Sequence, residues 1–301
     1  MLANLGAAAG LTFIGTLVTF LPRSFELWLG PKLGRLFMLV DARRRAIAEE
    51  NMRRCLPELS TEDREKLLRR NFEHYGILGL EIFHMFSPFP DHYRSYCSKI
   101  VKIEGLDHWK KAHAKGKGTI IMMGHYANWE MAGYVGSAGV PVLMATRPLK
   151  PKWVLDKITS ARHSLGLGRT AYGKRIMPEL IKQLKKGDTI GFVLDQYAPP
   201  PMGVPARFFG VTVDTQAALG LFVQRTGAAI VPLHQRRDEA GRIVLRFEEE
   251  VELSEHDLVD ASTTATKLAA VIERHIRSCP SQWLWVHRRF KNVVWPAVQT
   301  A

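Results

Sequence analysis

The chain has 301 residues, enough for one large domain or two small ones, and its 42 Lys and Arg against 29 Asp and Glu give a formal net charge of +13. Hydrophobic residues make up 46% of it, which excludes an intrinsically disordered or low-complexity chain. The excess charge is concentrated, because residues 141–187 carry a net charge of +9 and residues 188–301 one of −1. Such a basic block attracts polyanions, and composition leaves nucleic acid, an anionic membrane, a phosphorylated substrate and an acidic protein open.

The cysteines Cys55, Cys97 and Cys279 are odd in number and far apart in the sequence. Neither a CxxC pair nor a Cys/His cluster at zinc spacing includes them. We therefore expect three free thiols in a reducing, cytosolic environment.

The first 22 residues predict a membrane anchor. Residues 1–22 carry no charge, and the run from Leu5 to Leu21 is almost wholly apolar, near the lower limit of the roughly 17–25 residues that span a bilayer. A secretory signal peptide has a basic residue before its apolar run, whereas Arg23 follows this one. A signal peptide and a buried core helix remain the alternatives. By the positive-inside rule, the basic residues that follow the run predict a cytoplasmic location for the rest of the chain. These residues are Arg23, Lys32, Arg35, Arg43, Arg44 and Arg45.

Residues 23–100 have a helical pattern and are expected to form a helical region packed on the catalytic domain that follows. Ser60 with Asp63 three residues later is typical of a helix start, with Ser60 as the N-cap. Apolar residues then recur at helical spacing as far as Ile82.

From Val101 to the C-terminus the pattern changes to short apolar runs that alternate with helical segments. This alternation predicts an α/β domain over residues 101–301, in which helices cover a sheet. The predicted strands are 119–123, 141–145, 189–194, 228–233 and 243–247. The predicted helices are 128–138, 152–165, 177–186, 215–226 and 261–277.

The first of these strands ends in a candidate catalytic pair, His125 and Glu130. A histidine at a strand end can act as a general base toward a hydroxyl, and a carboxylate on the following helix can hold its ring in the required tautomer. Taken alone, the HxxxxE spacing also fits a purely structural pair. A zinc site is the other alternative, but the HExxH spacing is absent.

The chain resembles the bacterial lipid A biosynthesis acyltransferases, within the wider glycerolipid acyltransferase group. The resemblance begins with His125-x4-Glu130 after an apolar strand and covers nearly the whole chain. The further matching motifs are Thr146-Arg147-Pro148, Asp195-Gln196, Phe208-Phe209-Gly210, Gly227-Ala228, Val231-Pro232 and the C-terminal run from Pro280 to Lys291. The fold that this resemblance implies is a central mixed sheet flanked by helices, preceded by a transmembrane helix and a helical region.

The resemblance implies transfer of a fatty acyl chain from an acyl thioester to a hydroxyl of a lipid A precursor. His125 is expected to deprotonate that hydroxyl and Glu130 to orient His125. The expected donor is acyl carrier protein, with coenzyme A as the alternative, and no cofactor or metal is implied. The expected location is the bacterial inner membrane, with the catalytic domain on its cytoplasmic face.

The resemblance also gives the basic block a purpose, because the carrier protein is acidic and the acceptor is phosphorylated. Arg suits bidentate phosphate contacts and Lys supplies a point charge. Nucleic acid is not expected, since no helix-turn-helix, zinc finger or RNA-recognition motif is present. The residues expected to bind substrate are Arg147, Lys150, Lys152, Asp195 and Gln196.

Two alternative functions stay open. One is the same chemistry on another acceptor, such as a lysophospholipid, a mannosylated lipid or an ornithine lipid. The other is a non-catalytic, membrane-anchored protein that binds anionic lipid through the basic block.

Overall fold

The computed structural model describes residues 2–145, 150–171, 176–291, 293 and 295. Its helical elements are α1 (Leu2–Thr19), α2 (Arg23–Val40), α3 (Ala42–Cys55), α4 (Thr61–Phe83), η1 (His84–Phe86), α5 (His92–Ile100), α6 (Leu106–His113), η2 (Trp129–Ala138), α7 (Lys152–Ser164), α8 (Ile176–Lys185), α9 (Ala218–Thr226), α10 (Glu255–Val259), α11 (Ala261–Ser278) and η3 (Pro280–Gln282). Its strands are β1 (Val101–Glu104), β2 (Thr119–Met123), β3 (Val142–Ala145), β4 (Arg169–Ala171), β5 (Thr189–Val193), β6 (Gly203–Phe208), β7 (Val211–Gln216), β8 (Ala229–Arg237) and β9 (Ile243–Phe247).

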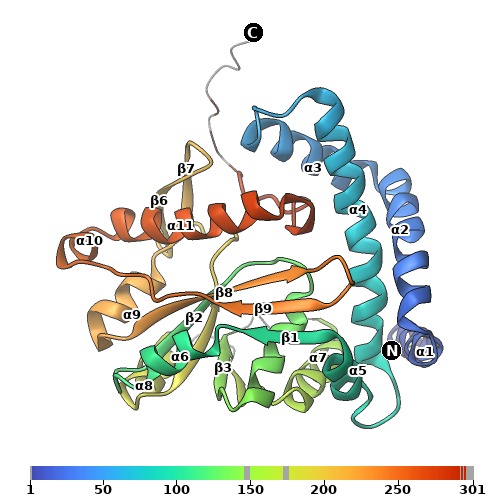
Figure 1. Cartoon of the computed structure of the whole chain (residues 1–301), viewed down its shortest axis with the longest axis horizontal. Helices are drawn as coiled ribbons and strands as arrows, with labels where there is room; N and C mark the ends of the chain where they lie inside the picture. The colour runs from blue at the N-terminus through green and yellow to red at the C-terminus, as the bar shows by residue number, and fades with distance from the viewer. Residues whose placement is uncertain (1, 146–149, 172–175, 292, 294, 296–301) are drawn as a thin grey trace.

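Within these residues a mixed seven-stranded sheet has the order β1-β9-β8-β2-β5-β3-β4 (Figure 1). The strands from β8 to β4 are parallel, and β9 runs antiparallel to β8. The predicted α/β class and its central mixed sheet are confirmed. A separate antiparallel hairpin, β6–β7, was not among the predicted strands.

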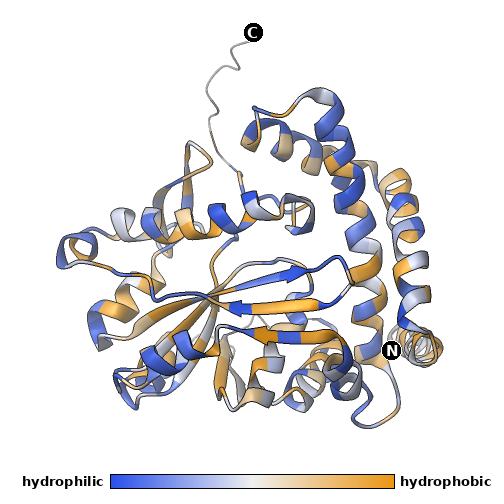
Figure 2. Cartoon of the chain, viewed as in Figure 1, coloured by the Kyte–Doolittle hydropathy of each residue, from blue (hydrophilic) through white to orange (hydrophobic). Residues whose placement is uncertain are grey.

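The alternation of side chains along β2 divides the core between the two faces of the sheet. Ile120 and Met122 belong to one hydrophobic cluster, which also contains residues of α3, α4, α8, α9 and α11. Ile121 and Met123 belong to the other, with residues of α5, α6, α7 and η2. Each face is covered, which accounts for the continuous apolar runs of the central strands (Figure 2).

The helical region of residues 23–100 shares the first of these clusters with the sheet, as Phe72 of α4 illustrates. Ser60 accepts a hydrogen bond from the Asp63 amide at 3.0 Å, which confirms the predicted start of α4. Helices α2 and α4 lie side by side (Figure 1). A Cβ on Gly76 would lie 1.9 Å from the Gly30 carbonyl oxygen, so glycine is required where the two backbones meet.

The predicted N-terminal transmembrane helix is not supported. Among the described residues, no helix is both long enough and apolar enough to cross a membrane. The apolar run forms α1, but one face of α1 packs on the protein: Val18 is buried, and a Cβ on Gly15 would lie 2.5 Å from the Phe86 carbonyl carbon. Thr19 ends the helix with a hydrogen bond to Ser87 Oγ at 2.9 Å.

Candidate active site

The register of two parallel strands brings the centre of the site together. β2 and β5 are neighbours, with Met123 opposite Val193. The carboxyl ends of parallel strands lie at the same edge of a sheet, so His125 and Asp195, each two residues further on, face one another there. The Leu194 amide donates a hydrogen bond to the Met123 carbonyl at 3.0 Å and carries the pairing past the strand ends.

Asp195 is the carboxylate that orients His125. His125 Nδ1 lies 2.7 Å from Asp195 Oδ1, and the His125 backbone N–H donates to Asp195 Oδ2 at 2.7 Å. The indole N–H of Trp283 donates to the same Oδ2 at 2.7 Å. Asp195 is 3% exposed and Trp283 is 1% exposed, so this carboxylate is removed from water and satisfied by three N–H donors.

The electrostatics fix the tautomer of His125. Burial raises the pKa of Asp195, but the interactions with His125 and the Trp283 hydrogen bond outweigh it and lower that pKa to about 2. Because an ionised carboxylate only accepts hydrogen bonds, Nδ1 of His125 carries the proton and Nε2 has the free lone pair. Burial lowers the pKa of His125, but the Asp195 charge and hydrogen bond prevail and raise it above 6.5.

Gln196 lies on the reactive side of the imidazole ring. Its side-chain Nε2 is 3.2 Å from His125 Nε2. The amide N–H therefore occupies the place where a substrate hydroxyl would donate its hydrogen bond. The His125 side chain keeps 17% of its surface exposed, so its ring is accessible from this side.

The prediction that Glu130 orients the His125 ring is wrong, because Asp195 contacts that ring instead. Glu130 lies in the first turn of η2 and forms a two-point ion pair with Arg162 of α7, at 2.8 and 2.9 Å. The physical reason is competition: the Asp195 carboxylate already accepts the Nδ1 proton, and the Arg162 guanidinium matches a carboxylate in geometry and charge. Glu130 still helps to raise the pKa of His125 through its charge. Its assignment as a catalytic residue stays a prediction.

The loop between β2 and η2 holds an unusual backbone conformation at Ala127, where φ is 45°. Two hydrogen bonds stabilise it: the Ala127 amide donates to the Gln282 carbonyl at 3.0 Å, and His74 Nε2 lies 3.2 Å from the Ala127 carbonyl oxygen. Burial lowers the pKa of His74 to about 3, so its ring is neutral and donates here.

Asn128 connects this loop to a buried network of charges. Its side-chain oxygen accepts the Glu130 amide at 3.2 Å, and its Nδ2 donates to Glu81 at 3.1 Å. Glu81, fully buried in α4, also binds Arg23 of α2 at 2.6 Å and two nitrogens of Arg237. The loop that carries His125 is thus connected to a network of buried charges that reaches α2.

The remaining predicted substrate residues have separate outcomes. Arg147 lies outside the described residues. Lys150 and Lys152 are exposed, and Lys152 pairs with Asp156 at 2.7 Å at the start of α7. The substrate-binding role of these two lysines stays a prediction. Asp195 and Gln196 do lie in the site, but both contact His125 itself.

Sequence reasoning missed Trp283 and Arg162 as parts of the site. Trp283 belongs to the C-terminal motif and was separated from His125 by more than 150 residues of chain. The isolated bridge between Tyr126 and Trp283 brings it to the loop that carries His125. Arg162 could have been found from the sequence, because it lies in the basic block of residues 141–187 and a nearby carboxylate such as Glu130 is a suitable partner for it.

Among the described residues, no metal-binding cluster includes His125 or Asp195. The arrangement can supply a neutral imidazole that accepts a proton at Nε2 and an adjacent carboxylate that stabilises the resulting imidazolium.

Comparison with known proteins identifies the family of this chain. The family described as "Bacterial lipid A biosynthesis acyltransferase" matches residues 4–292. The chain is 29% identical over 276 residues to the lipid A biosynthesis palmitoleoyltransferase of Escherichia coli (strain K12), covering 90% of this chain and 87% of that protein. It is 28% identical over 287 residues to the lipid A biosynthesis lauroyltransferase of the same strain, covering 94% and 92%.

A phosphatidylinositol mannoside acyltransferase of Mycobacterium tuberculosis (strain ATCC 25618 / H37Rv) is 28% identical over 174 residues, 56% of this chain and 54% of that protein. The related proteins thus include acyltransferases that act on different lipid acceptors. Because the family match covers nearly the whole chain, including the His125 loop and the C-terminal Trp283 segment, this protein is an acyltransferase that belongs to the bacterial lipid A biosynthesis acyltransferase family.

Proposed function

We propose that this protein transfers a fatty acyl chain from acyl carrier protein to a hydroxyl of a lipid A precursor at the cytoplasmic face of the inner membrane. The observation that carries the proposal is the 2.7 Å contact between His125 Nδ1 and the buried Asp195 carboxylate, which leaves Nε2 as a base. Family membership supports the acyl transfer and the lipid A precursor.

In this mechanism the acceptor hydroxyl replaces the Gln196 amide at His125 Nε2 and gives its proton to that nitrogen. The alkoxide attacks the thioester carbonyl carbon and forms a tetrahedral intermediate. The C–S bond then breaks, the thiolate takes the proton from the imidazolium, and the ester remains. Asp195 stabilises the imidazolium while it exists, and no acyl-enzyme is needed. Backbone amides at the helix start after His125 or the Arg147 guanidinium would stabilise the negative charge on the tetrahedral oxygen.

The test is a transfer assay with purified protein and a matrix of donors and acceptors. The donors are acyl carrier protein and coenzyme A thioesters, and the acceptors are a lipid A precursor, a lysophospholipid, a mannosylated lipid and an ornithine lipid. We expect ester formation on the precursor with the carrier-protein donor, and none with a His125→Ala blank. Transfer confined to another lipid, or equal in the blank, contradicts the proposal.

The mannosylated lipid is tested as a separate acceptor, because a phosphatidylinositol mannoside acyltransferase is among the relatives. Mass spectrometry of membrane lipids after gene deletion separates the two acceptors in the cell. A lower acyl number of lipid A supports the proposal, and an unchanged number with a shift in another lipid class supports the alternative.

Membrane binding is proposed through one exposed apolar surface, which we call the N-terminal patch. Large hydrophobic side chains are exposed along one face of α1 and α2, while the opposite faces pack on η1 and α4. On the outer face of α2, Leu39 and Val40 are 67% and 76% exposed. On its inner face, Gly30 is buried against Gly76 of α4. The members of the patch are Phe13, Ile14, Leu17, Phe20, Phe25, Trp28, Leu33, Leu36, Leu39, Val40 and Phe89.

The patch has the features of a surface that lies in the membrane interface. Trp28 is 55% exposed, and the Lys32 ammonium lies 3.6 Å from the centroid of its ring, an aromatic and basic pair suited to the headgroup level. Exposed Arg43 and Arg44 follow at the start of α3, where they can meet anionic headgroups.

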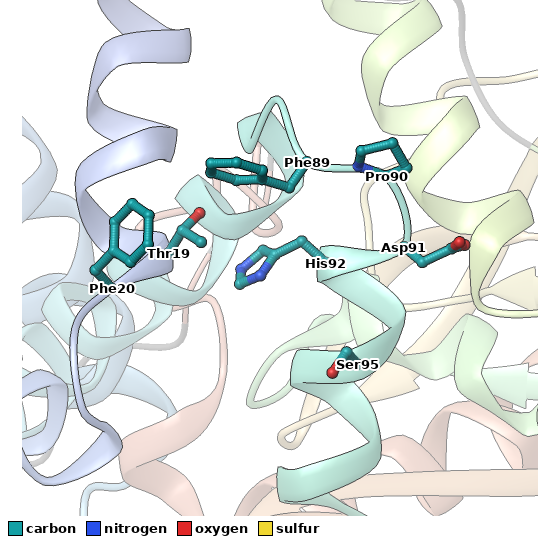
Figure 3. Close-up of a pocket in the computed structure, with 7 residues that line it drawn as sticks. All are labelled: Thr19, Phe20, Phe89, Pro90, Asp91, His92 and Ser95. Carbon is teal, nitrogen blue, oxygen red and sulfur yellow. The ribbon is translucent and has the colours of Figure 1, made fainter.

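An apolar pocket of about 330 Å³ lies in the patch beyond the end of α1. Figure 3 shows Phe20, from the end of α1, and Phe89 and His92, from the other side, around this hollow. Phe20 and Phe89 meet edge to face, with ring centroids 5.8 Å apart. Their contact joins α1 and the segment before α5 into one surface, which favours simultaneous insertion of both.

A Leu36→Glu/Leu39→Glu variant should lose binding to vesicles that contain anionic lipid. Burial of one leucine side chain is worth about 1.5–3 kcal/mol, so the two changes should weaken binding by at least about 100-fold. Vesicle sedimentation measures the effect. The matched control is Val259→Glu, since Val259 is 84% exposed on α10, outside the patch. Equal losses in both variants, or binding unchanged in the first, would exclude the patch as the membrane contact.

A further inference from the structure

A second cluster of chemically active side chains lies outside the catalytic site. It combines His234 of β8, Glu248 directly after β9 and His275 of α11. One potential ligand atom from each lies within 4.8 Å of the other two. His234 is 8% exposed and His275 is 2% exposed, whereas the Glu248 side chain reaches the surface.

Three of the four imidazole nitrogens of this cluster lack hydrogen-bond partners. His234 Nε2 and both ring nitrogens of His275 are buried and unsatisfied. His275 Nε2 lies 3.0 Å from Glu248 Oε2, but not in a hydrogen-bonding direction. Buried polar atoms without partners are uncommon because they lose their hydration without compensation, and a bound ion would supply the missing interaction.

We propose that His234, Glu248 and His275 form a binding site for a divalent transition-metal ion, with Zn²⁺ the best match. Two imidazoles and one carboxylate are a ligand set that zinc accepts in tetrahedral sites, with a water as the fourth ligand. Imidazole ligands disfavour Mg²⁺ and Ca²⁺, which prefer oxygen. Zinc binds the neutral form of an imidazole through the lone pair of one ring nitrogen.

Binding requires a local rearrangement of the two imidazole rings and of Arg274. The two rings lie face to face, with centroids 4.3 Å apart and planes 11° apart, so one ring must turn before both lone pairs converge on an ion. Rotation of a histidine ring about its Cβ–Cγ bond (χ2) has broad, roughly two-fold preferences. Arg274 pairs with Glu248 at 2.5 Å, but its side chain is 62% exposed and can move into solvent when the ion takes the carboxylate.

The location predicts a structural role for the ion. The ligands come from β8, the segment after β9 and α11, none of which carries His125 or Asp195. A bound ion would therefore tie α11 to the sheet. Because Tyr126 packs edge to face on both His234 and His275, with centroid distances of 5.6 and 5.8 Å, the site also supports the residue next to His125.

The test uses the full-length protein without a histidine tag, stripped of metal with a chelator and titrated with Co²⁺ or Zn²⁺. We expect one Co²⁺ per chain with the visible spectrum of a four-coordinate ion, and a rise in Tm of several degrees with Zn²⁺. Glu248→Gln and His275→Gln should weaken binding at least about tenfold. An octahedral spectrum, or no bound ion, overturns the proposal.

Matched controls separate the site from scattered surface binding. Glu252→Gln and His256→Gln change exposed residues of the same types and should leave the affinity unchanged. If these controls reduce binding as much as the cluster variants do, the proposal is wrong. If His275→Gln misfolds, Glu248→Gln still decides the test, because the Glu248 side chain reaches the surface. The circular dichroism of the Glu248→Gln protein, compared with the wild type, checks that this variant is folded.

Discussion

Asp195→Asn should lower kcat about 10³–10⁴-fold while the protein stays folded, as expected for loss of the carboxylate that fixes a catalytic histidine. Three N–H groups point at Asp195: His125 Nδ1, the His125 amide and the Trp283 indole. A carboxylate accepts from all three, whereas an amide has one oxygen and an NH₂ group. One orientation of the amide sets NH₂ against the Trp283 and backbone donors.

The other orientation damages catalysis directly. If the asparagine NH₂ donates to Nδ1, the His125 proton moves to Nε2, and the nitrogen that faces the substrate can no longer accept a proton. The variant therefore loses the base through the wrong tautomer. A transfer assay at saturating donor and acceptor measures the fall in kcat, and near-UV circular dichroism checks that the packing of Trp283 is retained.

The pH profile separates Asp195 from Glu130 as the group that acts on His125. The Asp195 charge and hydrogen bond raise the pKa of His125 against burial, so the active neutral form is gained as pH rises through a pKa above 6.5. Without that carboxylate, burial dominates, and the acidic limb of the kcat profile should move to lower pH. Glu130→Gln should move the limb less, since Glu130 contributes through its charge and has no hydrogen bond to the ring.

The opposite ranking of the two variants would return the orienting role to Glu130. A double variant, His125→Ala/Asp195→Asn, adds a further check. Groups that act as one unit are not additive, so it should lose little more activity than His125→Ala alone. Full additivity would mean that Asp195 acts independently of His125.

The sequence predicted the α/β class and the position of His125 after a strand, but it assigned the wrong hydrogen-bond partner to the His125 ring. The alternation of apolar strands and helices carries the α/β class, and a strand end placed His125 correctly. The partner depends on the register of β2 with β5, which sets Met123 opposite Val193. Sequence spacing reports only neighbours along the chain, so it favoured Glu130, five residues away, over Asp195, 70 residues away.

The N-terminal prediction failed for a related reason. Average hydropathy sums over all faces of a helix and does not distinguish a helix surrounded by lipid from one that packs on the protein along one side. In α1, Gly15 and Val18 face the protein while Phe13 and Leu17 are exposed. The same one-sidedness continues in α2, where Gly30 and Gly34 meet α4 and Leu36 does not.

Glu81→Gln should reduce the free energy of unfolding by about 3–5 kcal/mol, the usual effect of breaking a buried ion pair. Glu81 is fully buried and lies between the guanidinium groups of Arg23 and Arg237, with Asn128 as a further donor. An uncharged amide removes the counter-charge of the buried Arg237 guanidinium and leaves Arg23 with Glu26 as its remaining carboxylate partner. Urea denaturation followed by fluorescence gives the change, which should lower the midpoint at a constant m-value.

The pH dependence of stability tests the same charge independently. Burial raises the pKa of Glu81, but Arg237 and Arg23 outweigh it and lower the pKa to about 2. A depressed folded-state pKa means that the stabilisation is complete above the unfolded-state pKa of about 4.3 and is lost as pH falls toward 2. Glu81→Gln should therefore flatten the loss of stability in this window, whereas a variant that only disturbs packing would keep the wild-type slope.

The matched control is Glu73→Gln on the same helix. Glu73 pairs with Arg35, whose side chain is 58% exposed, and an exposed pair of this kind contributes about 0.2–1 kcal/mol. A similar small loss in Glu81→Gln would show that the buried network does not stabilise the fold. Asn128 links Glu81 to the Glu130 amide in the loop after His125. The Glu81→Gln variant should therefore combine its loss of unfolding free energy with a lower kcat, measured at temperatures where it is still folded. That coupling would extend the determinants of the His125 loop to α2, the helix that also carries the exposed residues of the N-terminal patch.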